Sequence, residues 1–208
     1  MRNKRRRKNM RSNVCKIEKG TKDLAAILEE SERVAEYNGL AGKQAMQLRL
    51  LCEEIDGMLP NVIDNFEGSL FIDYDGGICK INVSIKIPEF NAEKKQELIG
   101  ISKDKKNASA KGIVGRIRNA IEDFFLSDSG VAALDASHDA FHLSTGYGEF
   151  VDYSYLWSLT QYKSAVDQDQ APSEWDELEK SVIASIADDV IVGVKGNLAN
   201  IVIVKKFG

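Results

Sequence analysis

Two histidines four residues apart are the first side chains whose types and spacing could do chemistry. On a helix, His138 and His142 would share a face, and two imidazoles placed in this way can bind zinc. Asp135 lies close by, and Asp139 occupies the place of the glutamate that follows the first histidine in a zinc-protease motif. Residues 141–143 alternate as a strand does, which would move the imidazoles apart. We interpret both as surface or packing histidines, with a metal site as the alternative.

Three cysteines are the next candidates for chemistry. Cys15, Cys52 and Cys79 form no CxxC pair and are odd in number, which argues against a disulfide framework and a zinc ribbon. Cys52 lies in an apolar stretch of a predicted helix, where a thiol serves as a small hydrophobic side chain. We expect Cys79 on the polar side of a predicted strand. Neither has a histidine nearby in the sequence, so we do not predict a cysteine nucleophile.

Three aromatic residues, Trp157, Tyr162 and Trp175, could stack on an adenine ring. Aromatic residues at helical spacing are more often part of a hydrophobic core. We therefore predict a packing role for all three.

The composition indicates a folded protein. Of the 208 residues, 43% are hydrophobic and 29% are charged, which is close to the globular average and excludes wholesale disorder. The length fits one large domain or two small ones. No apolar run approaches the roughly 20 residues that span a bilayer, and residues 12–37 lack the apolar region of a signal peptide. We expect a soluble, cytoplasmic protein without a membrane span.

The first eleven residues carry an unusual charge. They contain seven basic residues and no acidic one, which leaves 21 basic against 32 acidic side chains in the remainder, a net charge of −11. An acidic body is a poor partner for nucleic acid, but the basic segment alone could bind RNA or an anionic membrane. The alternative is a solvated segment, docked at most on its own acidic body. We interpret residues 1–18 as a flexible basic arm, with residues 1–11 disordered and dispensable for folding, and residues 19–208 as a single domain.

Hydrophobic patterning predicts helices and two hairpins in the rest of the chain. Apolar residues at helical spacing indicate helices over residues 21–38, 40–59, from about 109, 154–166 and 173–186, with Thr21 and Ser173 as caps. Alternating patterns on either side of glycine turns predict hairpins over residues 69–87 and 189–205, and residues 141–144 form a possible short strand. Residues 89–110 are lysine-rich and are expected to form a loop. This order predicts an α+β fold, a two-layer sandwich with helices on one face of a mixed, mostly antiparallel sheet.

This order of elements, with the residues inside it, resembles the ATP-binding domain that gyrase, Hsp90, histidine kinases and anti-sigma-factor kinases share. The resemblance covers most of residues 21–208 and is most specific at residues 47–58, the hairpin after them, residues 111–117 and the closing hairpin. It is greatest to the small stand-alone bacterial members. In that family a helix supplies a glutamate and, four residues on, an asparagine. The glutamate orients water and the asparagine helps to hold Mg²⁺ against the nucleotide phosphates.

The family's catalytic pair is only half present in this chain. Glu54 matches the glutamate, which makes it the catalytic candidate if the protein is active, but Met58 stands where the asparagine is expected. A thioether is not a ligand for Mg²⁺, and Asp56 could replace it only if the helix turned by most of a residue spacing. The resemblance therefore implies no metal ligand set here.

The family's adenine-binding motif, Asp-x-Gly-x-Gly, should follow the second strand of the first hairpin. Residues 86–90 occupy that place and do not match it. Residues 73–77 look superficially similar, but they lie between the two strands, where a hairpin turn explains them.

The third family motif is a glycine-containing turn that enters a helix after a mobile lid. Gly112 and Gly115 match it, and Lys111 precedes them, so these three residues are candidates for nucleotide binding. Backbone N–H groups at a helix start can hold a phosphate. The small residues could equally allow a helix and a sheet to pack closely.

Two functions remain open from these observations. The first is a degenerate member of the family without catalytic activity, acting as a regulatory or protein-binding module with a protein partner. The second is a functional ATP-binding protein or anti-sigma-type kinase that uses ATP and Mg²⁺ through a divergent metal site. A nucleic-acid-binding protein led by the basic arm ranks third, because the body is acidic.

Overall fold

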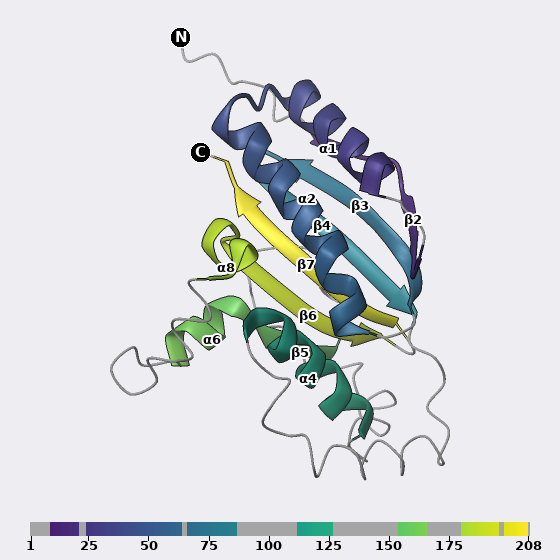
Figure 1. The fold of residues 1–208 in the computed structure, drawn as a ribbon. Coiled ribbons are helices and arrows are strands. Elements are labelled where there is room, and N and C mark those ends of the chain that lie inside the picture. The colour runs from purple at the N-terminus through teal and green to yellow at the C-terminus, as the bar shows by residue number, and fades with distance from the viewer. Residues whose placement is uncertain are drawn as a thin grey trace.

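A sheet with helices against one face organises the described part of the computed structural model, as Figure 1 shows. The structure describes residues 9–20, 24–63, 66–86, 112–126, 154–165, 180–195 and 198–207. The strands are β1 (Asn9–Arg11), β2 (Cys15–Glu18), β3 (Glu67–Asp75), β4 (Ile78–Lys86), β5 (Ser154–Ser158), β6 (Asp189–Lys195) and β7 (Leu198–Lys206). The helices are α1 (Leu24–Asn38), α2 (Lys43–Val62), α4 (Gly112–Leu126), α6 (Leu159–Ala165) and α8 (Val182–Ile186).

The seven strands follow the order β1-β3-β4-β7-β6-β5, and β2 pairs with β3 beside β1. Every pairing among the described strands is antiparallel. The predicted α+β class, with helices layered on one face of a mostly antiparallel sheet, is therefore confirmed.

The first two helices form where the hydrophobic pattern predicts them. The end of α1 is fixed by Gly39, whose φ of 70° is accessible to glycine at little cost. The N–H of Gly39 donates to the carbonyl of Glu36, and the N–H of Leu40 donates to that of Ala35. This pair of hydrogen bonds is the Schellman arrangement. Helix α2 extends to residue 62, past its predicted end at residue 59, so Pro60 lies inside its last turn.

Both predicted hairpins are confirmed. The turn between β3 and β4 has Gly76 at φ 58° and Gly77 at φ 98°, the positive angles that a tight two-residue hairpin turn requires. Strands β6 and β7 pair from Asp189 opposite Val204 to Lys195 opposite Leu198. The turn residues 196–197 lie outside the described residues.

One face of the sheet and the inner faces of α1, α2, α4 and α8 make the main core. Helix α2 contributes buried residues at the predicted helical spacing, including Leu48, Leu51, Ile55 and Leu59. Cys79 is also fully buried, so the prediction that it lies on the polar side of its strand is wrong. Side chains alternate along a strand with a period of two, which places Cys79 on the same face as Ile81.

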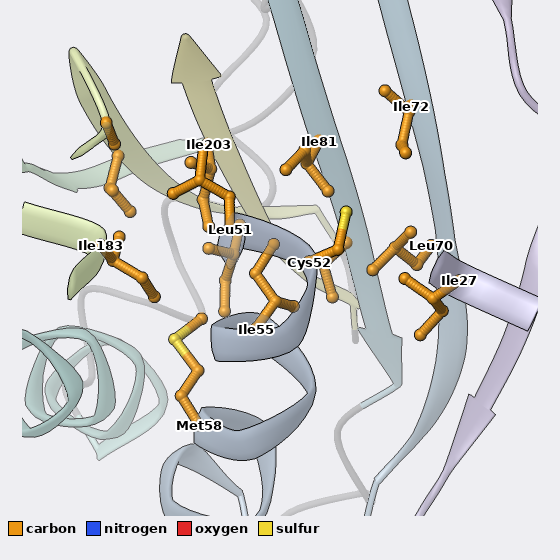
Figure 2. Close-up of a cluster of buried hydrophobic side chains, with 14 of the residues drawn as sticks. Ile27, Leu51, Cys52, Ile55, Met58, Leu70, Ile72, Ile81, Ile183 and Ile203 are labelled. Atoms are coloured by element: carbon orange, nitrogen blue, oxygen red, sulfur yellow. The ribbon is translucent and has the colours of Figure 1, made fainter. Parts of the chain in front are cut away.

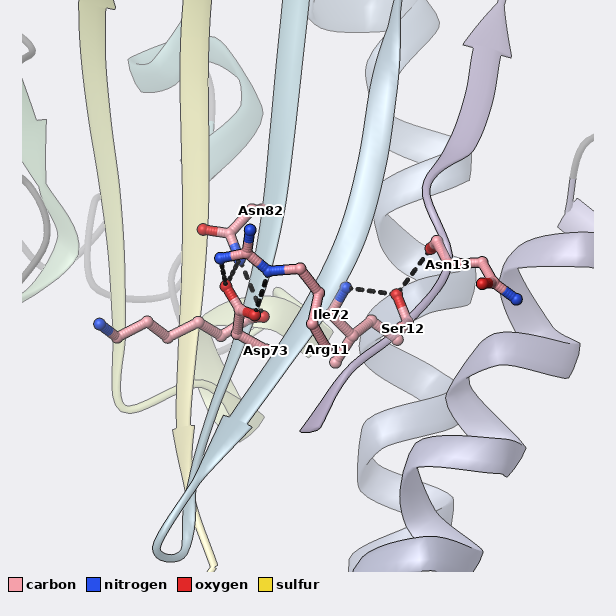
Figure 3. Close-up of polar contacts among 7 residues, drawn as sticks. Arg11, Ser12, Asn13, Ile72, Asp73 and Asn82 are labelled. Carbon is pink, nitrogen blue, oxygen red and sulfur yellow. Dashed lines mark hydrogen bonds and ion pairs between the residues drawn. The ribbon is translucent and has the colours of Figure 1, made fainter. Parts of the chain in front are cut away.

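The N-terminal residues depart most from the sequence-based prediction. Residues 9–11 and 15–18 are strands on the edge of the sheet, so the prediction of a flexible arm through residue 18 is wrong over residues 9–18. Between these strands, the N–H of Ser12 donates to the carbonyl of Ile72, and the Ser12 hydroxyl accepts the N–H of Ile72 at 2.8 Å (Figure 3). This exchange keeps the edge of β3 paired where the chain passes from β1 to β2. Residues 1–8 lie outside the described residues.

Two further expectations need correction. Residues 154–158 form a strand that pairs with β6 through an irregularity between Tyr155 and Trp157, so the helix predicted from residue 154 begins only at Leu159. Of the helix predicted over residues 173–186, residues 173–179 lie outside the described residues, and α8 begins only at Val182. Ser181 before it has an extended backbone, and its hydroxyl caps α8 by accepting the N–H of Ala184. The caps predicted at Thr21 and Ser173, and the strand at residues 141–144, fall outside the described residues.

Candidate functional site

Helix α2 carries the two positions on which the predicted nucleotide site depends. Glu54 and Met58 are one helical turn apart and therefore lie on the same side of α2. Glu54 is half-buried, and no described residue forms a hydrogen bond or an ion pair with its carboxylate. Met58 is only 4% exposed and belongs to the main core. Figure 2 shows its thioether on the side of α2 that is near Ile183 of α8.

The surroundings of Met58 do not provide a ligand set for a hard cation. Magnesium is bound by oxygen atoms, and a buried thioether supplies none. The residue before Met58 is Gly57, which has no side chain. Asp56 is two residues from Glu54 and therefore about 200° away around the helix. The described part of the chain contains no group of three histidine, cysteine or acidic residues placed to hold a metal.

The glycines predicted to bind phosphate lie in the first turn of α4. Gly112 begins the helix with φ 69°, and Gly115 is buried one turn later. The neighbouring Ile113 and Ile117 are buried in the main core, and α4 packs beside α2. The burial of Gly115 agrees with the close-packing interpretation. Lys111 lies outside the described residues, so the structure brings two of the three predicted binding residues onto one helix.

Residues 73–77, which superficially match the adenine-binding motif, have a structural role. Gly76 and Gly77 make the β3–β4 turn. Asp73 accepts two hydrogen bonds from Arg11 and one from Asn82 at 3.4 Å (Figure 3). The place where the family motif is expected, after β4, lies outside the described residues.

The three cysteines are buried thiols. Burial, together with the nearby Asp73 carboxylate, raises the pKa of the Cys79 thiol to about 12. Burial also raises the pKa of the Cys52 thiol well above its ordinary value. A thiol in this state does not form the thiolate that nucleophilic catalysis or metal binding needs. The prediction that Cys52 serves as a small hydrophobic side chain is confirmed.

The aromatic pair Trp157 and Tyr162 packs against the main core. Their ring centroids are 5.9 Å apart with an interplanar angle of 43°. The guanidinium of Arg116 lies over the ring of Tyr162, 4.9 Å from its centroid, so this contact joins α4 to α6. The packing role predicted for these two residues is confirmed. Trp175, His138 and His142 lie outside the described residues.

Sequence reasoning missed a buried carboxylate that organises the N-terminal strands. Glu30 on α1 accepts the backbone N–H and the side-chain Nδ2 of Asn13, both at 2.9 Å, and the Nη1 of Arg33 at 2.6 Å. Burial by itself opposes ionisation, but the hydrogen bonds from Asn13 and the charge of Arg33 outweigh it and lower the pKa of Glu30. The spacing of Glu30 and Arg33 was visible in the sequence, but the contact with Asn13 was not.

Among the helices that the structure describes, none has the length and apolar composition needed to cross a membrane. Comparisons of the chain with protein-family models, with curated proteins and with solved structures found no match.

Proposed function

We propose that this chain is a regulatory, protein-binding module of the cytoplasm, built on the ATP-binding fold of the histidine kinase and gyrase class without its metal-dependent nucleotide site. The order of elements supports the fold. Two helices precede a hairpin, another helix follows, and a second hairpin closes the sheet, with the helices on one face (Figure 1).

The burial of Met58 is the observation that best supports the absence of Mg²⁺-dependent nucleotide binding in this proposal. In the resembling family, the residue four positions after the glutamate offers an oxygen to Mg²⁺. Here that position holds a thioether that is 4% exposed and packed in the main core. Without a metal, the negative charge of a triphosphate would rest on backbone N–H groups and lysines alone.

Two exposed apolar side chains support the protein-binding role. Tyr37 in the last turn of α1 is 54% exposed and Met46 in the first turn of α2 is 62% exposed, and only residues 39–42 separate the two helices. Tyrosine and methionine are enriched at protein interfaces. We assign the partner-binding surface to this end of the helical layer.

The nucleotide part of the proposal is tested by thermal melting of the full chain with millimolar ATP, with and without Mg²⁺. We expect no Mg²⁺-dependent shift. A ligand at 100 times its Kd stabilises a protein by about 2.7 kcal/mol, which raises the Tm by several degrees. A shift of that size that requires Mg²⁺ would overturn the proposal.

The protein-binding part is tested by cross-linked co-purification from the source cells. We expect a stoichiometric partner that is lost from the double variant Tyr37→Ser, Met46→Gln and kept by the control variant Glu29→Gln, which changes an exposed residue of α1. A partner that the double variant keeps, or no stoichiometric partner, would contradict the assignment.

The alternative function is a working ATP-binding protein or anti-sigma-type kinase with a divergent metal site. The half-buried Glu54, without a partner among the described residues, supports it, because a water-orienting carboxylate would have this setting. The melting experiment distinguishes the two functions.

A further inference from the structure

Residues 9–18, which we call the N-terminal strap, lie along one edge of the sheet. They comprise β1, β2 and the three residues between these strands. Among the described strands, β1 and β2 pair only with β3, so the strap is bonded to the sheet on one side. Strand β3 also pairs with β4, from Glu67 opposite Lys86 to Asp75 opposite Ile78. Pairing with β4 therefore holds β3 in the sheet independently of the strap.

The pairing of the strap with β3 is irregular at its middle. The registers leave residues 12–14 of the strap facing only residues 71 and 72 of β3. One extra residue on an edge strand is a β-bulge, which locally disrupts the ladder. At the bulge the N–H of Ile72 donates to a side chain, the Ser12 hydroxyl, at 2.8 Å (Figure 3). The strap is thus held to β3 by two short strands of three and four residues.

The strap contributes few side chains to the main core. Cys15 and Ile17 are buried, and Met10 is partly buried against the core. Val14, in the bulge, is 63% exposed. The other members of the main core come from the rest of the chain. Loss of the strap therefore uncovers one border of the core and leaves most of its contacts in place.

A carboxylate on α1 holds the middle of the strap, where its pairing with β3 is irregular. Glu30 accepts both the backbone N–H and the side-chain Nδ2 of Asn13, each at 2.9 Å. Arg33 donates to the same carboxylate from within α1, so this ion pair does not need the strap. The contact between Glu30 and Asn13 is the one that joins α1 to the bulge.

We infer that the N-terminal strap opens as a unit while the rest of the domain stays folded, and that the contact between Glu30 and Asn13 keeps it closed. Proteins open locally in cooperative units, and units with few buried contacts open at a free energy well below that of global unfolding. Opening of the strap breaks its pairing with β3 but not the pairing of β3 with β4. It uncovers the backbone groups at the edge of β3, where another extended segment can pair. The strap therefore controls access to this edge.

Thiol labelling of the full chain in urea, below its unfolding transition, tests the opening. Cys15 is the reporter, and Cys52 and Cys79, which are also buried but lie outside the strap, are internal controls. Each rate is divided by the rate of the same thiol in the unfolded chain. Cys15 should react faster than the controls and respond little to urea, because the strap exposes only a small part of the surface that unfolding exposes. Equal rates and urea dependences for the three thiols would overturn the inference.

Glu30→Gln tests the contact that keeps the strap closed. An amide oxygen replaces only one of the two carboxylate acceptors, so this variant should raise the corrected rate of Cys15 about tenfold or more. The matched control Glu29→Gln removes the neighbouring, exposed carboxylate of α1 and should leave that rate unchanged. An unchanged rate in Glu30→Gln, or an equal increase in both variants, would overturn the inference.

Hydrogen exchange of the Ile72 amide, followed by NMR in the native full chain, tests the exposure of the β3 edge. This N–H donates to Ser12 of the strap, so it should exchange with the same opening constant as Cys15 labelling gives. Glu30→Gln should raise both by the same factor. Ser12→Ala removes the acceptor and should raise the labelling rate of Cys15 about fivefold, which provides a second test if Glu30→Gln does not fold. An Ile72 amide that exchanges only through global unfolding would overturn the inference.

Discussion

Arg11 and Asp73 face each other across β1 and β3, 62 residues apart in the sequence, and are joined by two parallel hydrogen bonds. The Nε of Arg11 donates to Oδ1 of Asp73 at 2.7 Å, and an Nη donates to Oδ2 at 3.0 Å. A bidentate arginine–carboxylate pair fixes both position and orientation. This contact joins the N-terminal strand to the β3–β4 hairpin.

The first prediction concerns the folded part of the N-terminal segment. Because the Arg11 side chain is 58% exposed, Arg11→Ala should cost only about 1 kcal/mol of unfolding free energy, from the ion pair and the contact with Phe71. Extending an N-terminal deletion from residue 8 to residue 11 should cost more, because it also removes the pairing of β1. Urea denaturation of the wild type, of Arg11→Ala and of the two deletion variants measures these differences in unfolding free energy. An equal stability for the two deletions would show that β1 contributes nothing.

The second prediction concerns pH and Glu30. The pKa of Glu30 is lowered in the folded state, so the ionised carboxylate contributes to the free energy of unfolding at neutral pH. This contribution is lost as the pH falls from about 4.3, the pKa in the unfolded chain, through the lowered pKa of the folded state. Glu30→Gln should cost about 1–3 kcal/mol at pH 7. The difference from the wild type should shrink as the pH falls through that window. Denaturation curves from pH 7 to pH 3 measure it, and a difference that does not change with pH would contradict the role of the charge. Glu29→Gln is the control.

The third prediction concerns the packing of Met58. Met58→Asn buries an amide in an apolar core and removes packing, so it should cost about 3 kcal/mol or more. Met58→Leu keeps the volume and should cost less than about 1.5 kcal/mol. Thermal melting with and without Mg²⁺ and ATP follows both variants. If Met58→Asn were as stable as the wild type and gained a Mg²⁺-dependent shift, the cleft would be open and only its metal ligand missing.

The fourth prediction concerns thiol reactivity. Cys52 and Cys79 are fully buried, and the pKa of Cys79 is raised to about 12, so neither should react with a thiol reagent at pH 8 in the folded protein. Both should react in guanidinium. Mass spectrometry of the protein labelled under the two conditions identifies the modified residues. Rapid labelling of Cys79 in the native protein would place it on an accessible face, contrary to the structure.

The local elements of this fold were predictable because their signals are local. The helical spacing of Leu51, Ile55 and Leu59 reports the buried face of α2. The glycines of the β3–β4 turn indicate in the sequence where the backbone takes positive φ angles, and Gly39 indicates where α1 ends. For the same reason, the candidate residues Glu54 and Met58 could be placed on one side of a helix from their spacing alone.

The tertiary structure decided what depends on distant partners. Strand β1 has three residues, too few for a periodic signal, and exists because β3 offers an unpaired edge more than 60 residues later. The sequence pattern of residues 154–158 suits a helix. These residues form strand β5 instead, because they pair with β6. The sequence likewise predicted that Met58 stands where the resembling family has a metal ligand, but it could not show that Met58 is buried where α2 packs near α8, more than 120 residues later. Long-range pairing and burial are set by which surfaces meet when the chain closes on itself, and no window of neighbouring residues contains that information.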